Sequence, residues 1–151
     1  LIQSPAIIEW LEESHPEHPL LPSDALGRAK VRALAAVVGC DIHPINNKRI
    51  LDYLRQVLKL DDQQVEQWCQ HWIDEGFSAL ETLLAADENR GDFCSGQQPT
   101  LADAYLIPQV DSSKRFHVDL SKYPNIQRIY DACMALPAFQ TAAPMKQPDA
   151  V

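Results

Sequence analysis

Long runs of one residue class are missing from this 151-residue sequence. Its apolar runs are interrupted within roughly ten residues, far short of the roughly 20 that a membrane-spanning helix needs. Lys and Arg never occur in runs longer than two, and the formal net charge is -8. A broad basic face is therefore not expected, which argues against nucleic acid and other polyanions as partners. No charged-then-apolar signal segment opens the chain, so we expect a cytoplasmic protein that does not bind membranes.

Closely spaced cysteines and short catalytic motifs are missing as well. The four cysteines, Cys40, Cys69, Cys94 and Cys133, form no CxxC pair and have no nearby histidine at metal-ligand spacing. We expect buried free thiols and no metal site. The sequence also lacks a βαβ pattern, a glycine-rich phosphate loop, a Ser/His/Asp motif and internal repeats. What remains is a series of helical patterns, which predicts an all-α helical bundle.

One segment predicts the central helix of that bundle. Thr100 followed by Asp103 is a variant of the capping box, so the helix is expected to begin at Leu101. The next residues are apolar nearly all round, which is typical of a helix enclosed by its neighbours. The two capping side chains must then satisfy backbone N–H groups that water cannot reach. We interpret Thr100 and Asp103 as structural residues.

Proline and helical periodicity divide the rest of the chain. Ser4-Pro5 is a compact helix start with Ser4 as the capping residue, and the prolines within residues 15–23 predict a connector. Gly76 inside an otherwise helical stretch indicates a close helix contact. Helices are predicted over residues 4–15, 23–41, 45–58, 62–86, 101–115 and 124–136, with a loop at 87–98, one or two turns at 138–143 and a frayed tail at 144–151.

Pro44 should kink or split the second helical stretch. Beyond it, the apolar side of the next helix, traced backwards by threes and fours, meets His43, Asn46 and Asn47. Burying an amide or an imidazole is unfavourable unless it is hydrogen-bonded, so either the protein or a ligand must supply partners. The pattern alone leaves both possibilities open. Arg49 lies one turn from Asn46 and can reach the same space.

The start of the first helix is a second polar feature. The free N–H groups and the positive end of the helix dipole at Ser4 form a natural seat for a carboxylate, with the Gln3 side chain beside it. By itself this feature is weak, because most helix N-termini bind only water.

Together these segments resemble the C-terminal helical domain of the glutathione transferases, and specifically the zeta class. Pro-Thr-Leu-Ala-Asp (99–103) occurs across many transferase classes. Cys-Asp-Ile-His-Pro-Ile-Asn-Asn (40–47) is similar to the maleylacetoacetate and maleylpyruvate isomerases of the zeta class, as are Leu-Ile-Pro-Gln-Val (106–110) and Arg-Phe-His-Val-Asp-Leu (115–120). The resemblance spans essentially the whole chain, with further matches at Gln-Ser-Pro-Ala-Ile-Ile-Glu-Trp-Leu-Glu-Glu (3–13), Leu-Leu-Pro-Ser-Asp (20–24) and Gln-Pro-Asp-Ala (147–150).

The resemblance implies a glutathione-dependent cis–trans isomerase that converts a maleyl dicarboxylate to its fumaryl isomer in the catabolism of aromatic compounds. Glutathione would be the cofactor that supplies the nucleophile, and a homodimer is expected. By the same resemblance, Gln3 and Ser4 match residues that hold the γ-glutamyl end of glutathione. His43 and Asn47 match polar residues near the cofactor.

Two arginines would carry the chemistry. Arg49 and Arg115 match arginines that face the substrate carboxylates and the developing enolate, a role that suits a planar, permanently charged guanidinium. We expect both to open onto one cavity beside the Gln3-Ser4 turn. Because each directly follows a lysine, Lys48 or Lys114, a solvated basic pair is the alternative interpretation.

The resemblance also implies a domain organisation. Residues 1–15 match the last helix of a truncated thioredoxin-like α/β domain, residues 16–23 a linker, residues 24–143 the helical domain and residues 144–151 a tail. The thiol-activating, Ser-rich motif lies outside this sequence, so the chain alone is not expected to be active. Two other functions stay open. One is a general glutathione transferase that conjugates electrophiles, and the other is a non-catalytic helical interaction module.

Overall fold

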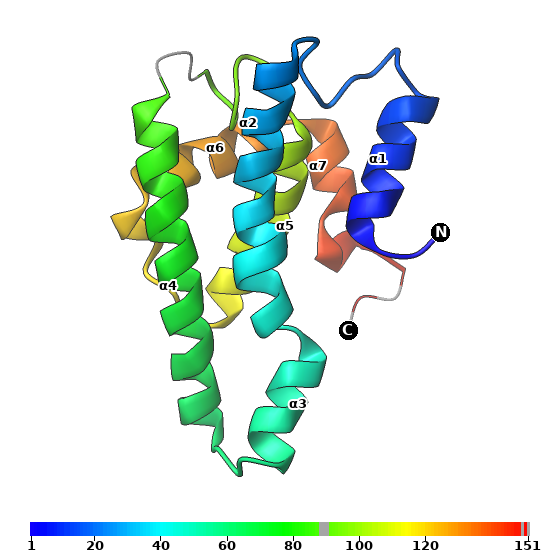
Figure 1. The fold of residues 1–151 in the computed structure, drawn as a ribbon. Coiled ribbons are helices and arrows are strands. Elements are labelled where there is room, and N and C mark those ends of the chain that lie inside the picture. Colours follow the sequence, from blue (N-terminus) through cyan, green and yellow to red (C-terminus); the bar gives the residue numbers. More distant parts are fainter. Residues whose placement is uncertain (88–90, 149, 151) are drawn as a thin grey trace.

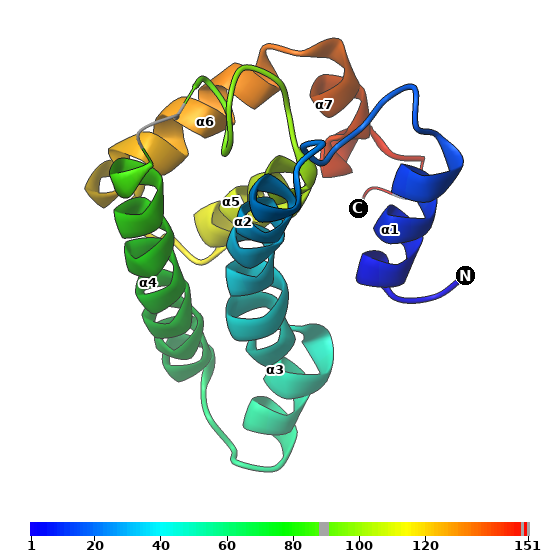
Figure 2. The ribbon, with the colours of Figure 1, turned by 45° about the horizontal axis from the view of Figure 1, so that its top comes forward.

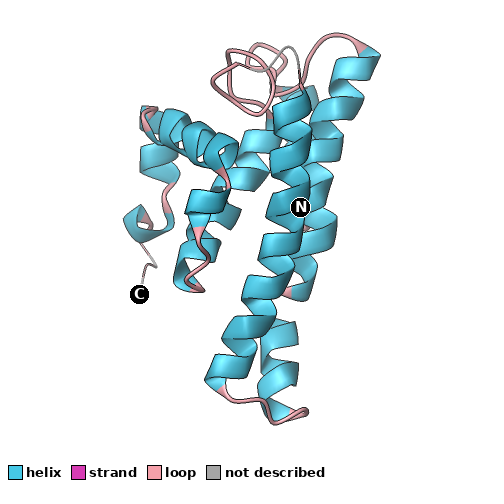
Figure 3. Ribbon diagram, turned by 90° about the vertical axis from the view of Figure 1, so that its left-hand side faces the viewer, coloured by secondary structure: helices cyan, strands magenta, loops and turns pink. Residues whose placement is uncertain are grey.

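The computed structural model describes residues 1–87, 91–148 and 150, and in that part of the chain it contains helices and loops but no strand (Figure 3). The predicted loop at 87–98 and the tail at 144–151 include residues 88–90, 149 and 151, which lie outside the described residues. None of the described helices has the length and apolar character needed to cross a bilayer. The elements (Figure 1) are α1 (Ser4–Ser14), α2 (Ala25–Ala36), the π-helix η1 (Val37–Ile42), the 3₁₀ turn η2 (His43–Ile45), α3 (Lys48–Gln56), α4 (Asp62–Ala86), α5 (Leu101–Arg115), the 3₁₀ turn η3 (Leu120–Lys122), α6 (Pro124–Met134), α7 (Pro137–Ala142) and the 3₁₀ turn η4 (Pro144–Lys146).

Helix α5 is the central helix, as predicted. It begins at Leu101, contacts α2, η1 and α6, and lies inside the bundle (Figure 2). At its start, Asp103 is fully buried, and its carboxylate accepts hydrogen bonds from the Thr100 N–H at 2.7 Å, the Thr100 hydroxyl at 2.8 Å and the Cys94 N–H at 2.9 Å. The prediction that side chains satisfy buried N–H groups here is confirmed, and the same carboxylate also holds the loop before the helix.

The path between α2 and α3 differs from the predicted one. The helix predicted over 23–41 begins at Ala25, with Asp24 as its N-cap, and changes at Val37 into a π-helix, in which the His43 N–H donates to the Val38 carbonyl. The helix predicted over 45–58 begins only at Lys48 and ends at Gln56. The kink expected at Pro44 is therefore preceded by a widened turn, which is a common feature of functional sites.

Two glycines allow this π-helix to be closely surrounded. A β-carbon on Gly76 of α4 would overlap the side chain of Ile42, which confirms the predicted close helix contact. A β-carbon on Gly39 would lie 2.8 Å from the Tyr105 ring of α5. The π-helix is thus held between α4 and α5, and these contacts fix where His43 begins the next turn.

Several apolar residues are more exposed than the helical patterns predict. Cys69, Cys94 and Cys133 are buried free thiols, but Cys40 is exposed, so the prediction for Cys40 was wrong. Leu26 and Leu83, which the periodicity assigns to the apolar sides of their helices, are also exposed. The helical pattern finds an apolar stripe, but whether every residue of the stripe is covered depends on how far the neighbouring helix extends.

Candidate functional site

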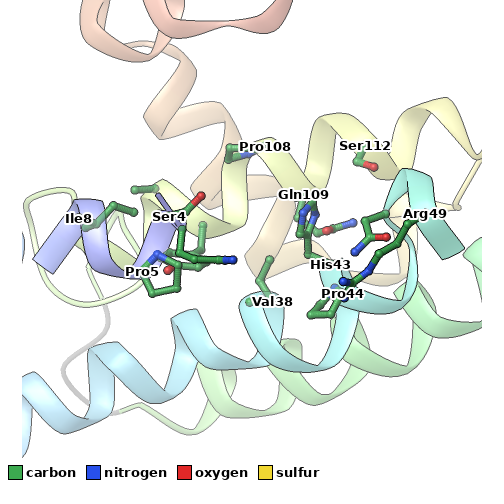
Figure 4. A pocket seen from close by; sticks show the side chains of 15 residues that line it. Ser4, Pro5, Ile8, Val38, His43, Pro44, Arg49, Pro108, Gln109 and Ser112 are labelled. Atoms are coloured by element: carbon green, nitrogen blue, oxygen red, sulfur yellow. The ribbon is translucent and has the colours of Figure 1, made fainter. Parts of the chain in front are cut away.

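A cavity of about 640 Å³ lies where the start of α1, the segment from η1 to α3, and one side of α5 meet (Figure 4). Five of the six residues that the sequence proposed for the site line it, although they come from distant parts of the chain. The lining consists of Gln3, Ser4, Pro5 and Ile8 from the first segment, Val38, Gly39, His43, Pro44, Asn47 and Arg49 from the second, and Ala104, Tyr105, Pro108, Gln109 and Ser112 from α5.

The cavity is electropositive in a chain whose net charge is -8. The N-terminal ends of α1 and α3 both reach it through Ser4 and Asn47, and such helix ends favour anions. Arg49 sits in the first turn of α3, where a cation opposes the helix dipole. No Asp or Glu lines the cavity among the residues that the structure describes. Placing Arg49 there lowers the stability of α3, and together with the two helix ends it makes the cavity a site for an anion.

The α1 end of the cavity is held by polar contacts to the rest of the bundle. The Glu12 carboxylate, which is buried, accepts from the Leu20 N–H at 2.7 Å, and the Leu20 carbonyl accepts from the Leu101 N–H at 2.8 Å. On the neighbouring turn, Arg32 of α2 donates two hydrogen bonds of 2.8 Å to Glu9 and holds the pKa of that carboxyl below its usual value. The connector therefore joins α1 to the first residue of α5.

The local start of α1 differs from the expected cap. The helix begins at Ser4 itself, and the N-cap is Gln3, which has a φ of 71° and forms no side-chain capping bond within the described chain. Positive φ is uncommon outside glycine and marks a constrained turn. Both side chains consequently belong to the cavity wall, and neither is used to close the helix.

The polar residues at the kink differ in their hydrogen-bond partners and in whether they line the cavity. Asn47 is the N-cap of α3, and its Oδ1 accepts from the Ile50 N–H at 3.3 Å. The protein itself therefore supplies a hydrogen-bond partner for the oxygen of that amide. His43 begins η2, is exposed, and lines the cavity. Asn46 does not line it, and neither polar atom of its buried amide has a partner within the described chain. The predicted polar cluster is real, and two of its three members face the cavity.

The two predicted arginines are placed differently. Arg49 lines the cavity, whereas Arg115, at the last residue of α5, is exposed and does not line it. The expectation of a single cavity for both guanidinium groups is therefore wrong in this structure. Ser112 is the last residue of α5 that lines the cavity, and Arg115 lies about one helical turn beyond it, at the end of the helix.

The neighbouring lysines have partners of their own. Lys48 pairs with Asp52 on α3. Lys114 lies 3.5 Å from the centre of the Tyr130 ring and 3.4 Å from Asp111. Neither Arg49 nor Arg115 forms a hydrogen bond or an ion pair with any described residue, which leaves both guanidinium groups available to an anion.

Sequence reasoning missed the contribution of α5, whose residues were assigned to the core. Tyr105, Gln109 and Ser112 line the cavity at a spacing that places them along one side of the helix. The Tyr105 phenol is protonated at neutral pH, as in any tyrosine, and can donate a hydrogen bond; burial raises its pKa further. The available signal was polar residues recurring at helical spacing within an apolar helix.

Comparisons with known proteins agree with this geometry. Residues 62–132 match the family model described as glutathione S-transferase, C-terminal domain. The chain is 60% identical over 149 residues to the maleylpyruvate isomerase of a Ralstonia species, an alignment that covers 99% of this chain and 70% of that protein. The chain belongs to the zeta class of glutathione transferases.

Solved structures place this zeta-class chain more closely. It superposes with a TM-score of 0.99 and 59% identity on a holo structure of maleylpyruvate isomerase, a bacterial zeta-class enzyme. The alignment covers 100% of this chain and 71% of that one. It also matches a maleylacetoacetate isomerase from Anaeromyxobacter dehalogenans with a TM-score of 0.93 and 46% identity, covering 100% of this chain and 66% of that one. That structure holds dicarboxyethyl glutathione and citrate in its active site.

Proposed function

We propose that this zeta-class transferase is a glutathione-dependent isomerase that converts a maleyl dicarboxylate, maleylpyruvate or maleylacetoacetate, to its fumaryl isomer. The observation that supports it most strongly is Arg49, a guanidinium with no partner in the described chain. It faces a carboxylate-free cavity that two helix N-termini also reach. Glutathione carries two carboxylates and the substrate two more, so an electropositive cavity fits both. The relatives named as maleylpyruvate and maleylacetoacetate isomerases support the same reaction.

The chain supplies binding and electrostatics, and the bound cofactor supplies the nucleophile. Glutathione, when bound, provides a thiolate that adds to the cis double bond and leaves after rotation about the resulting single bond. The dicarboxyethyl glutathione bound by the Anaeromyxobacter relative has the composition that addition of the thiol to the double bond of maleate or fumarate gives. The described lining of the cavity has no cysteine or carboxylate that could attack in its place.

Each site residue named from the sequence has a role in this proposal. Gln3 and Ser4, at the start of α1, would hold the γ-glutamyl end of glutathione. His43 and Asn47 would contact the cofactor from the other wall. Arg49 would pair with a substrate carboxylate and favour the negative charge that develops on addition. Arg115 would approach the far carboxylate from the end of α5 by a change of its flexible side chain.

The domain assignment is part of the proposal. Residues 1–15 would be the last helix of a thioredoxin-like domain, residues 16–23 the linker, residues 24–143 the helical domain and residues 144–151 the tail. Trp10, which is 49% exposed, and the exposed Leu11 support this, because they give α1 an apolar side that the described chain does not cover. We also propose that the protein is a cytoplasmic homodimer, as expected for its class.

An assay of the full-length protein tests the function. The protein is incubated with glutathione and either maleylpyruvate or maleylacetoacetate, and formation of the fumaryl isomer is followed. We expect turnover that requires glutathione. Conjugation of a neutral electrophile without isomerisation would instead favour a general transferase. Absence of both activities, together with absence of glutathione binding, would favour a non-catalytic helical module.

A further inference from the structure

Gln109 is a buried residue whose amide nitrogen has no partner within the described chain. Its side chain is 4% exposed, and its Nε2 is shielded from solvent and has no hydrogen-bond partner in the described part of the chain. Buried polar groups in proteins are nearly always hydrogen-bonded, because an unpaired buried donor is destabilising. The residue therefore needs an explanation that packing does not give.

The position of Gln109 supplies that explanation. It lines the cavity from α5, next to Pro108, which removes a backbone hydrogen bond from the same turn. Figure 4 shows Gln109 across from His43, between Ser4 at one end of the cavity and Arg49 at the other. Two destabilising residues, Pro108 and Gln109, thus occur in one turn, where the helix forms the middle of the cavity wall. Local rules of stability are most often broken at functional sites.

We propose that Gln109 donates a hydrogen bond from Nε2 to the keto oxygen of the substrate and is a catalytic residue of the isomerase. This inference rests on the proposed function. If glutathione occupies the Gln3-Ser4 end and Arg49, at the other end of the cavity, pairs with a substrate carboxylate, the double bond and the adjacent keto group must lie between them, beside Gln109. Addition at the double bond moves an electron pair onto the keto oxygen. The pair returns when the bond to sulfur breaks, so no proton or oxidant is consumed.

The chemistry of the amide favours the keto oxygen over a carboxylate. A carboxylate is fully charged before the reaction, and a guanidinium is its natural partner. The keto oxygen acquires its charge only during the reaction, and a fixed, buried, neutral donor stabilises such charge without having to reorganise. Gln109 has these properties, whereas His43 and Arg49 are exposed.

The test replaces Gln109 by residues of similar size in the full-length protein. Gln109→Met removes the donor and keeps the volume, and Gln70→Met is the matched control. The Gln70 amide donates to the Phe116 carbonyl at 2.8 Å and to Glu66 at 3.1 Å, away from the cavity. We expect Gln109→Met to keep or raise the melting temperature and to lower kcat by about 100- to 1,000-fold, the effect of losing one oxyanion donor. Gln70→Met should do the reverse, with a lower melting temperature and an unchanged kcat.

A binding measurement decides the proposal without turnover. In the presence of glutathione, γ-ketopimelate and pimelate differ only by a keto group, and calorimetry gives the affinity of each. We expect the wild type to prefer γ-ketopimelate and Gln109→Met to lose that preference, with glutathione affinity unchanged. If the ratio of the two affinities is the same in the wild type and in Gln109→Met, Gln109 does not bind the keto oxygen, whether or not the wild type isomerises maleyl acids. A wild type that binds glutathione but isomerises neither maleyl acid overturns the proposed function.

Gln109→Glu adds a second variant with its own signature. The introduced carboxyl can donate a hydrogen bond only when it is protonated, so kcat should recover towards acidic pH. A merely structural glutamine would not give this pH profile. An activity of Gln109→Glu that shows the same pH profile as the wild type would contradict the proposal.

Discussion

Ile42 of the π-helix lies directly against Gly76 of α4, so closely that a β-carbon at position 76 would overlap its Cδ1 and Cγ1 atoms. Ile42 is fully buried, and His43 of the cavity wall follows it immediately. The contact therefore links the middle of the longest described helix to the geometry of the site. A glycine inside a 25-residue helix is unfavourable by about 1 kcal/mol relative to alanine, and the contact explains why it is present.

Gly76→Ala should destabilise the protein. Helix propensity alone predicts a gain of about 1 kcal/mol, but overpacking against Ile42 is expected to cost about 1–3 kcal/mol, and it should prevail because both residues are buried. Urea unfolding measures the change, and glutathione affinity should fall with it because His43 is displaced. Gly76→Ala combined with Ile42→Ala should cost less than the sum of the two single changes, since the two residues are in contact. A more stable Gly76→Ala protein would show that the contact adjusts freely.

Asp103→Ala should be severely destabilising. The change removes the acceptor for the buried Thr100 and Cys94 N–H groups. We expect a loss of about 2–5 kcal/mol, combining the loss of an N-terminal cap with that of the buried acceptor, measured by urea unfolding. The control is Asp119→Ala, which removes an exposed carboxylate that accepts from Ser121 and should have a much smaller effect. Equal effects of the two changes would mean that burial does not matter here.

The buried thiols should make stability fall at alkaline pH. Burial raises the pKa of Cys69 from 9.0 to about 11, and burial next to Asp103 raises the pKa of Cys133 to about 12. Above pH 9 the unfolded chain releases these protons while the folded protein keeps them, so unfolding becomes more favourable as pH rises, up to the folded-state pKa. Each thiol should contribute a slope of about 1.4 kcal/mol per pH unit.

Urea unfolding at a series of pH values from neutral to alkaline checks this slope. Cys133→Ala should flatten it by the contribution of one thiol, after allowing for the lower stability of the variant. Cys40→Ser is the control, since the Cys40 thiol is exposed in the folded protein. A slope that Cys133→Ala leaves unaltered would refute the assignment.

Local chemistry explains which parts of the fold were predictable. The start of α4 has a local signal, because the Asp61 carboxylate accepts from the Gln64 N–H at 2.8 Å in a capping box. The start of α5 at Leu101 was equally clear, because a capping pair and an apolar run stand next to each other in sequence. The π-helix had no such local signal. It depends on Gly76 and Tyr105, which are distant in sequence and meet η1 only in the folded chain.

Local signals likewise separate the site residues that could be predicted from those that could not. Gln3, Ser4, His43, Asn47 and Arg49 could be named from a helix start, a polar kink and a family resemblance, and they meet in one cavity. Arg115 was grouped with them by resemblance, but the end of α5 places it outside the cavity lining. Gln109 was missed because a polar residue in a core helix is informative only when its burial and lack of a partner are known.

The most direct test of the account compares two arginines of the same helix in the full-length protein. Arg49 lines the cavity without a partner in the described chain, whereas Arg55 lies outside the cavity and donates to Asp62 at 3.0 Å. The measurement is kcat/KM for glutathione-dependent isomerisation of maleylpyruvate by Arg49→Ala and by Arg55→Ala. Both variants lose one positive charge, so a general charge effect would appear in both.

Arg49→Ala should lower kcat/KM by about 10- to 100-fold, the loss of a charge-assisted hydrogen bond of roughly 1.5–3 kcal/mol, and Arg55→Ala should leave it unchanged. Conjugation of a neutral electrophile should survive in both variants. If Arg49→Ala isomerises maleylpyruvate as well as the wild type does, Arg49 holds no substrate carboxylate and the proposed function of this cavity is contradicted.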